Sequence, residues 1–446
     1  MSRIEKDVLG DIELPADALY GANTARALCS FPPEGLKTLA DYPHLVEALL
    51  RIKWATAETN RRIGELEEAK AQAIIQSART LLEKKQFEDF PLCHLHGGGG
   101  TAMNMNANEV LANCAEERLG GKRGEYRYVH PNDHVNLNQS TNDVYPTACH
   151  MAVISKSRLL DSVLTKLETA FQGLARKTGT QSRLARTCLQ DAVEVTYGDL
   201  FGSYAALVRR LQLRINRSVD ALHTVNLGGT IVGRLNDAPE KYRVSIIPVL
   251  QNITGVSSYR NAENLFDAAQ NPDDFVAVSA ALEISARGMI KISQDLRLLS
   301  SGPEAGLGEI QLPPVEAGSS IMPGKINPVI PESVIQCCFQ VIGSHHACAV
   351  GFDHGELDLN IWESSMVFNV LDSMELLTKA CVILKDRCLD GLRVNAETNR
   401  QNVNTIIPLL TRLMHIHGYS AISDVCRVAG GNIHNLRTLL RERGFV

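Results

Sequence analysis

Apolar residues recur in this chain at the spacing of helices that face a bundle. Between residues 273 and 302 they are separated by steps of three and four, a period of about 3.5 residues. The mostly apolar positions of this stripe are Val278, Leu282, Ser285, Met289, Ile292, Leu296 and Leu299. A shorter stripe with the same steps is formed by Val163, Leu167, Phe171 and Leu174. We expect both stripes to lie on long helices and to face the core.

The distribution of proline supports long helices. Residues 147–238, 273–302 and 332–407 contain no proline, and proline is the residue that most strongly breaks a helix interior. No alternating, strand-like series of comparable strength stands out. The sequence therefore predicts a mainly α chain in three parts. These are an N-terminal domain over residues 1–136, a central helical bundle over 137–395 and a short C-terminal helical domain over 396–446.

Composition narrows the class of protein. The chain has 446 residues and a net charge of −5, without the basic run that nucleic-acid binding requires. No apolar stretch approaches the roughly 18–20 residues that span a bilayer, and the charged N-terminus lacks the apolar core of a signal peptide. Eleven cysteines, scattered mostly singly, favour free thiols over a disulfide framework. We therefore expect a cytoplasmic protein that binds neither nucleic acid nor membrane.

Polar chemistry concentrates in the segment 318–332, G-S-S-I-M-P-G-K-I-N-P-V-I-P-E. Two hydroxyls, one ammonium and one amide lie within a few residues of each other, on Ser319, Ser320, Lys325 and Asn327. The flanking glycines and prolines are typical of a loop that carries a reactive serine or closes over a substrate. The alternative is an ordinary polar connection between helices.

Two further clusters have complementary chemistry. Segment 97–108, G-G-G-G-T-A-M-N-M-N-A-N, offers backbone N–H groups and neutral side-chain donors, among them Thr101. No G-K-[ST] follows it, so it is not a nucleotide-binding P-loop. Segment 132–147 contains the consecutive donors Ser140, Thr141 and Asn142. A polar turn would explain either cluster taken alone.

Together the clusters resemble the aspartase/fumarase superfamily. Residues 318–327 match every specified position of the family pattern G-S-S-x-M-P-x-K-x-N, and the glycine-rich segment resembles its G-T-x-x-N-M-N segment. Residues 186–192, R-T-C-L-Q-D-A, resemble the family's R-T-H-x-Q-D-A with one departure. The resemblance runs from the N-terminal R-I-E to about residue 420. It is very specific for the superfamily and less specific for the substrate.

The resemblance implies the assembly and the reaction. Family members are homotetramers with a 20-helix core, and each active site takes residues from three subunits. They catalyse anti elimination across C2–C3 of a succinyl compound, a small dicarboxylate, to give fumarate, and no cofactor is implied. Removing the weakly acidic C3 proton needs a base on one face and donors around the developing aci-carboxylate.

Site roles follow from the same resemblance. Ser319 would be the base, with its oxyanion stabilised by backbone N–H groups of its own loop, while Lys325 and Asn327 would bind the carboxylate that gains charge. The other carboxylate and the C2 substituent would be held by Thr101, Ser140, Thr141, Asn142, Thr187 and Cys188. We expect supporting roles for Ser320, Met322, Glu332 and His96.

Several positions depart from the family. Cys188 stands where many members have a histidine that pairs with a glutamate matching Glu332, and that pair cannot form here. Hydroxide is a poor leaving group that needs an acid, so the departure counts against a fumarase. Gly99 lacks the hydroxyl common in fumarases, and residues 234–236 read R-L-N where the family has G-x-N. The chain also ends at Val446, from which we expect a shorter C-terminal domain than is usual in the family.

The favoured prediction is an ammonia-lyase that releases an amine from a 2-aminosuccinate. The alternative is a C–S lyase that releases a thiol from a compound such as S-(2-succinyl)cysteine, because a thiol with a pKa of about 8.5 leaves as thiolate without an acid. A fumarase ranks third, and a non-catalytic relative ranks last because Ser319, Lys325 and Asn327 are intact. The roles of Cys188 and Arg234 stay open.

A metal site is not predicted. Residues 93–96, C-H-L-H, contain adjacent ligand types, but neighbouring side chains rarely converge on one ion, and no distant Cys/His set has zinc spacing. His96 directly precedes the glycine-rich segment, so we expect it to border the site.

Overall fold

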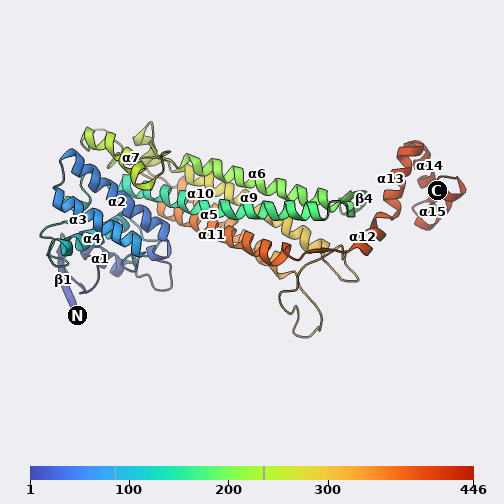
Figure 1. Ribbon diagram of the computed structural model, residues 1–446, viewed down its shortest axis with the longest axis horizontal. Coiled ribbons are helices and arrows are strands. Elements are labelled where there is room, and N and C mark those ends of the chain that lie inside the picture. Colours follow the sequence, from blue (N-terminus) through green and yellow to red (C-terminus); the bar gives the residue numbers. More distant parts are fainter. Residues whose placement is uncertain (86, 235–236) are drawn as a thin grey trace. The chain divides into compact units, whose positions relative to one another are not determined.

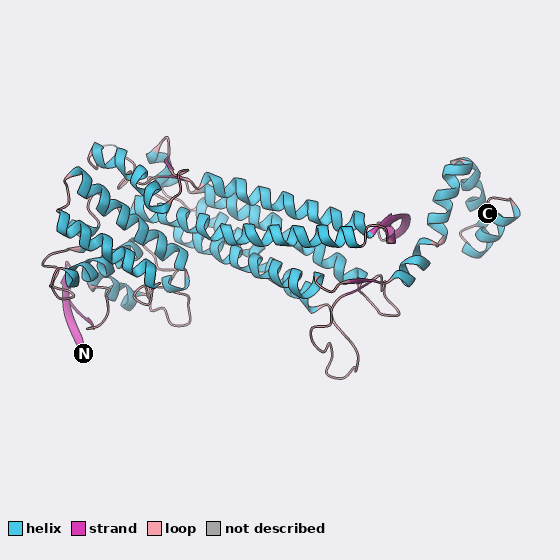
Figure 2. Cartoon of the chain, viewed as in Figure 1, coloured by secondary structure: helices cyan, strands magenta, loops and turns pink. Residues whose placement is uncertain are grey.

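The computed structural model describes residues 1–85, 87–234 and 237–446. Helices dominate it, and strands occur only in short pairs within this described chain (Figure 2). The α-helices are α1 (Ala22–Ser30), α2 (Pro43–Ile63), α3 (Glu68–Lys84), α4 (Thr101–Arg118), α5 (Thr141–Lys177), α6 (Tyr197–Ala221), α7 (Glu240–Thr254), α8 (Leu265–Gln270), α9 (Asp273–Leu299), α10 (Val329–Asp353), α11 (Glu363–Leu384), α12 (Ala396–Val403), α13 (Ile406–His417), α14 (Tyr419–Ala429) and α15 (Ile433–Glu442). Short 3₁₀ and π segments are η1 (Leu39–Asp41), η2 (Pro131–Val135) and η3 (Lys385–Leu389). The prediction of a mainly α chain is confirmed.

The strands form two-stranded sheets. β1 (Ser2–Asp7) pairs with β2 (Gly10–Pro15), β3 (Ser182–Thr187) with β4 (Gln190–Thr196), and β7 (Ile310–Gln311) with β8 (Arg393–Val394), all antiparallel. β5 (Thr224–Val225) and β6 (Arg260–Asn261) pair in parallel. These strands were not predicted, because they are at most seven residues long and β1 and β3 carry charged residues at several positions.

Three of the five long helices, α6, α9 and α11, lie within the proline-free spans, and α5 and α10 each contain one proline near the N-terminus, Pro146 and Pro331 respectively. α5, α6, α9, α10 and α11 are labelled in Figure 1. Every position of the two predicted stripes is buried, on α9 and α5 respectively. The 3.5-residue pattern therefore identified the core-facing sides of both helices.

The chain divides into two compact units, each assembled from three segments. Unit 1 comprises residues 1–161, 213–284 and 340–377, and unit 2 comprises residues 162–212, 285–339 and 378–446. Each of the five long helices passes from one unit to the other. The unit boundaries therefore fall inside these helices, and the domain boundaries at 136 and 395 remain a prediction.

In unit 1, α2 packs against α3 and α7, and α4 packs against α1 and α3. Buried Glu109 on α4 fixes the start of α1. Its carboxylate accepts hydrogen bonds from the backbone N–H groups of Gly21 at 2.9 Å and Asn23 at 2.7 Å, and from the Thr24 hydroxyl at 2.6 Å. Burial raises the pKa of Glu109, and these hydrogen bonds act in the opposite direction. The arrangement holds the N-terminal segment onto the helix that carries Thr101.

In unit 2, the β3–β4 hairpin packs against α12 and α13. A small apolar cluster with Leu413, Val425 and Leu440 holds α13, α14 and α15 together. None of the described helices combines the length and the apolar composition that crossing a bilayer requires.

Candidate active site

The serine loop, residues 318–327, is closed at its neck by two hydrogen bonds. The Gly318 N–H donates to the Lys325 carbonyl at 2.9 Å, and the Asn327 side-chain amide donates to the Gly318 carbonyl at 2.9 Å. A Cβ atom at position 318 would collide with the Lys325 carbonyl, so this close approach requires glycine. Asn327 thus has a structural role in shaping the loop in this chain.

Ser319 lies at the start of this loop with its oxygen facing backbone donors. Ser319 Oγ accepts hydrogen bonds from the N–H groups of Ile321 at 3.2 Å and Met322 at 3.0 Å. Hydrogen bonds donated to an oxygen stabilise its deprotonated form. The arrangement supplies the local feature that a serine needs in order to act as a base.

The remaining loop side chains point into open space. Ser320 and Lys325 are exposed, and Lys325 forms no ion pair within the described residues. Ile321 is 84% exposed and Met322 is 48% exposed. A cation without a partner beside uncovered apolar side chains is an arrangement that a bound anion and a covering surface would complete.

Glu332 lies in the first turn of α10, just beyond the serine loop. Its carboxylate pairs with the guanidinium of Arg297 at 3.2 Å. The family's histidine–glutamate pair is therefore replaced here by an arginine–glutamate pair on the surface of unit 2.

Thr187 and Cys188 occupy the tip of the β3–β4 hairpin. Thr187 pairs with Gln190, which leaves Cys188 and Leu189 as a two-residue turn with φ angles of +53° and +61°. A turn with two left-handed residues usually contains asparagine or glycine. Holding two other side chains there costs of order 1–2 kcal/mol per residue, so this exposed tip is a strained segment of the kind found at functional sites.

The root of the hairpin is firmly anchored. Arg186 pairs with the fully buried carboxylate of Glu309 at 2.6 Å. The side chain of Asn402 donates to the same carboxylate oxygen at 2.9 Å, and Asn399 donates to the Glu309 backbone carbonyl at 2.8 Å. The C-terminal segment therefore helps to position Thr187.

The glycine-rich segment forms the entry to α4 in unit 1. Gly98, Gly99 and Gly100 all have positive φ angles, and a Cβ atom on Gly100 would collide with the Tyr145 ring. This backbone path places Thr101 as the exposed first residue of α4. The helix N-terminus adds free N–H groups to the Thr101 hydroxyl, an arrangement suited to an anion.

Ser140, Thr141 and Asn142 form the N-terminal turn of α5 and meet α4 through Asn104. The Asn104 side-chain amide donates to Thr141 Oγ1 at 3.0 Å. Asn142 is held from the other side, since its amide donates to the Ile231 carbonyl at 2.8 Å. The structure thus joins two of the predicted clusters at the N-termini of two helices.

A buried lysine that the sequence analysis missed supports this junction. Lys53 of α2 is fully buried, and its ammonium donates to Asn136 Oδ1 at 3.0 Å and to Gln139 Oε1 at 2.9 Å. Asn136 Oδ1 also accepts from Asn104 at 3.2 Å. Burial lowers the pKa of Lys53 to about 7. In the sequence, the position of this lysine next to Ile52, on the buried side of α2, was the feature that could have indicated a buried polar contact.

Asp143, the third residue of α5, fixes the same turn. Its carboxylate accepts from the backbone N–H groups of Ser140 at 3.0 Å, Gly228 at 2.8 Å and Thr230 at 3.1 Å. Burial raises the pKa of Asp143 to about 6, and these N–H groups and the Lys53 charge oppose the rise. The aspartate therefore holds Ser140 in place through its backbone N–H and ties the start of α5 to the segment at Gly228 and Thr230.

His96 lies directly before the glycine-rich segment, and its expected place at the border of the site remains a prediction. Its Nδ1 lies 2.8 Å from the Gly97 carbonyl, and its buried Nε2 has no hydrogen-bond partner among the described residues. Within those residues no group of three or more His, Cys, Asp or Glu side chains could hold a metal ion. Arg234 is exposed, while Leu235 and Asn236 lie outside the described residues.

The predicted site residues are divided between the two units. Thr101, Ser140, Thr141, Asn142 and His96 belong to unit 1. Ser319, Ser320, Met322, Lys325, Asn327, Glu332, Thr187 and Cys188 belong to unit 2. Each unit therefore carries its own set of donors, and Ser319 and Lys325 both belong to unit 2.

Comparisons with known proteins define the class. Residues 10–343 match the model of a family described as lyases. The aspartate ammonia-lyase of Pseudomonas aeruginosa is 41% identical over 99% of this chain and 93% of its own length. Those of Bacillus subtilis and Escherichia coli K12 are 39% and 38% identical, over 96% and 100% of this chain and 89% and 93% of their own lengths.

Solved structures agree. A fumarate lyase:delta crystallin from Brucella melitensis, bound to cobalt, has a TM-score of 0.95 and 40% identity, covering 100% of this chain and 96% of that chain. A class II fumarase from Schistosoma mansoni has a TM-score of 0.94 and 30% identity with the same coverage. The chain is a lyase. It belongs to the aspartase/fumarase superfamily, so the fold and family implied by the sequence motifs are confirmed.

Proposed function

We propose that the protein is an aspartate ammonia-lyase, which eliminates ammonia from aspartate to give fumarate. Relatives with that name are about 40% identical over nearly the whole chain. The observation that carries the proposal is the position of Ser319 Oγ over two backbone N–H groups, in a loop that also presents Lys325.

The proposed reaction begins at C3 of the substrate. The Ser319 oxyanion takes the C3 proton, and the electron pair moves into the adjacent carboxylate to form an aci-carboxylate dianion. Lys325 stabilises this developing charge, because a compact ammonium close to the oxygens offsets it in a water-poor site. The electron pair then returns to form the C2–C3 double bond as the C2–N bond breaks. Fumarate and ammonia are released, and Ser319 passes its proton to solvent.

Neutral donors would fix the rest of the substrate. Thr101, Ser140, Thr141 and Asn142 from unit 1 and Thr187 from unit 2 would bind the second carboxylate and the C2 amine. Binding by hydroxyls and amides holds a dicarboxylate without excess affinity for the fumarate product. Asn104 would hold these donors in position through its hydrogen bond to Thr141, and Lys53 would do so through its hydrogen bond to Asn136.

The leaving group fits a site in which Cys188 stands at the position of the family's histidine. A substrate ammonium departs as neutral ammonia, so it needs no general acid, whereas hydroxide does. Cys188 at the strained hairpin tip would border the C2 substituent. It leaves more room than a histidine, and this favours the thiol-releasing C–S lyase as the second candidate.

The assembly and compartment belong to the same proposal. A homotetramer with shared sites would unite donors that this chain divides between two units. The described cysteines are all free thiols, which supports a reducing cytoplasm.

A substrate panel at fixed enzyme concentration tests the function. Fumarate absorbance would be followed with aspartate, malate, N-substituted aspartates and S-(2-succinyl)cysteine, and we expect aspartate to react fastest. Ser319→Ala, purified in parallel, reports any host enzyme carried through purification. Rapid release from S-(2-succinyl)cysteine with no reaction of aspartate would replace the C–N assignment by the C–S one.

Cys188→His separates the two assignments further. An aspartate lyase should tolerate the larger side chain, because ammonia is small. A lyase for bulky amines or thiols should lose most of its turnover through lost space and added charge. Cys29→Ser, at another exposed cysteine, is the matched control.

A further inference from the structure

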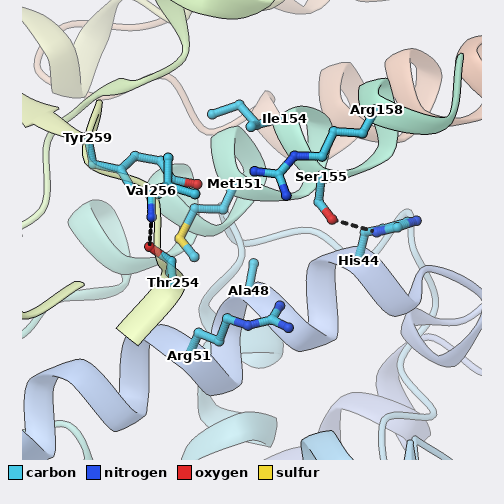
Figure 3. Close-up of a pocket in the computed structure, with 10 residues that line it drawn as sticks. All are labelled: His44, Ala48, Arg51, Met151, Ile154, Ser155, Arg158, Thr254, Val256 and Tyr259. Atoms are coloured by element: carbon cyan, nitrogen blue, oxygen red, sulfur yellow. Dashed lines mark hydrogen bonds between the residues drawn. The ribbon is translucent and has the colours of Figure 1, made fainter. Parts of the chain in front are cut away.

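A cavity of about 120 Å³ lies in unit 1 and contains none of the predicted active-site residues (Figure 3). One wall is the α2 face with His44 and Arg51, and another is the α5 face with Ser155 and Arg158. The connection from α7 to β6, with Tyr259, closes the third side. The volume is several times the ~10–15 Å³ that a single water needs, so the cavity has room for a small ligand.

Two guanidinium groups face this cavity from different helices. Figure 3 shows the side chains of Arg51 and Arg158 extending into the space between α2 and α5. Both charges act on Tyr259: burial raises the pKa of that phenol to about 12, and Arg158 and Arg51 oppose the rise. Two cations that both reach one phenol repel each other across a shared space, and an anion between them would relieve that repulsion.

In the described part of the chain, two of the three cations near the cavity pair with carboxylates, and the third, Arg158, does not. Glu47 pairs with Nη1 of Arg51 at 3.0 Å, and Glu375 pairs with the neighbouring Lys156. Arg158 is exposed and has no carboxylate at ion-pair distance among the described residues. Its planar fork of donors is therefore available for an oxyanion, which it can bind through two parallel hydrogen bonds.

Neutral groups complete the lining. His44 Nδ1 lies 3.0 Å from Ser155 Oγ, as drawn in Figure 3. Burial, and next the Lys156 charge, lower the pKa of His44, so it is an uncharged hydrogen-bonding group at neutral pH. Thr254 also lines the cavity, but its hydroxyl donates to the Leu250 carbonyl at 2.7 Å, so Ser155 supplies the hydroxyl that faces His44. Guanidinium, hydroxyl and imidazole groups around a small space are the donor set of an anion site.

We propose that this cavity binds a small oxyanion, a dicarboxylate or inorganic phosphate, between Arg51 and Arg158. The bound anion links α2 to α5. Those helices also carry Lys53, two residues beyond Arg51, and the Thr141 turn. The site is separate from the serine loop, and the binding claim stands whether or not the proposed reaction is correct.

Isothermal titration of the full-length protein with inorganic phosphate and, separately, succinate tests this site. Lys325→Met would be the background, because it removes the cation proposed to hold anions at the active site. We expect one remaining site per chain for at least one of the two anions. Arg158→Met should weaken it about tenfold or more, which corresponds to losing one charge-assisted hydrogen-bond pair of ~1.5–3 kcal/mol.

Arg176→Met is the matched control, since Arg176 is an exposed arginine on the same helix. It should leave the affinity unchanged. The succinate and phosphate arms identify the anion class. Equal affinity in Arg158→Met and its background, or no binding of either anion at millimolar concentration, would overturn the proposal.

Discussion

Arg186 and Glu309 form a 2.6 Å ion pair in which the carboxylate is fully buried. The pair joins the β3–β4 hairpin to a segment more than a hundred residues later, and Asn402 of α12 donates to the same oxygen of Glu309. The strained tip with Cys188 thus stands on an anchored root. Breaking such a pair leaves an uncompensated buried charge, which typically costs about 3–5 kcal/mol, so the orientation of the hairpin is strongly fixed.

Ser319→Ala should lower kcat roughly 10²–10⁴-fold, the usual contribution of a general base. KM should change little, because the hydroxyl acts on C3 in the transition state. Steady-state kinetics with aspartate measures both. Ser203→Ala, at an exposed serine of α6 outside the proposed site, is the control and should retain most of its activity. Turnover near that of the wild type in Ser319→Ala would remove the serine from the mechanism.

Lys325→Arg should be badly impaired although it keeps the charge. The planar, longer guanidinium cannot take the place of a compact ammonium against a carboxylate. We expect kcat/KM to fall at least tenfold, as measured with aspartate. An arginine variant with normal kinetics would show that charge alone matters there and would contradict the assigned contact.

Lys53→Met should raise KM for aspartate and lower stability by about 1–3 kcal/mol, the cost of leaving buried acceptors unpaired. The acceptors are Asn136 Oδ1 and Gln139 Oε1. Chemical denaturation gives the stability, and kinetics separates KM from kcat. Lys84→Met, at an exposed lysine of α3, is the control. If stability falls while KM stays constant, Lys53 supports the fold and not the donor cluster.

Mixing two inactive variants tests the shared active site. Ser319→Ala and Thr187→Val protomers, denatured and refolded together, should regain part of the wild-type activity, because hybrid tetramers contain some sites built from undamaged segments. Each variant refolded alone is the control. A mixture that stays inactive after subunit exchange has been demonstrated by mass spectrometry would rule out sites shared in this way.

Glu363→Gln should change the pH dependence of stability. Burial raises the pKa of Glu363 to about 8 from its ordinary value near 4.5. Above about pH 4.5 the carboxyl ionises in the unfolded protein but stays protonated in the folded protein. The stability of the wild type is therefore greatest, as far as Glu363 is concerned, below about pH 4.5 and falls as the pH rises towards 8. The melting temperature of the glutamine variant relative to wild type should therefore increase between pH 5 and about 8. A constant difference would mean that Glu363 has found a cationic partner in the assembled protein.

The pattern of apolar residues along the chain was sufficient to predict the long helices, but local sequence was not sufficient to predict the hairpins. The stripe on α9 was readable because a 3.5-residue period persists over the whole helix. The turn at Cys188 and Leu189 was not, because neither residue favours the left-handed conformation that the structure imposes. Tertiary contacts such as the Arg186–Glu309 pair override the local preference there.

The sequence predicted which residues belong to the candidate site, but it did not predict how those residues are arranged in space. The motif around Ser319 identified the loop, and the structure added the two N–H groups that face its oxygen. Lys53 was missed because its acceptor Asn136 is more than eighty residues away, and a single helical lysine reads as a surface residue. Polar groups that depend on distant partners for their burial carry little local signal.

The exposed thiol of Cys188 makes the protein accessible to spectroscopy without an engineered handle. Cys188 and Cys29 are the exposed cysteines of the described chain, and the others are buried or partly buried. A Cys29→Ser background would therefore direct a fluorophore or spin label to the hairpin tip. A probe there sits on an anchored support, so changes in its signal on adding substrate would report local events at the proposed leaving-group position and not tumbling of the hairpin.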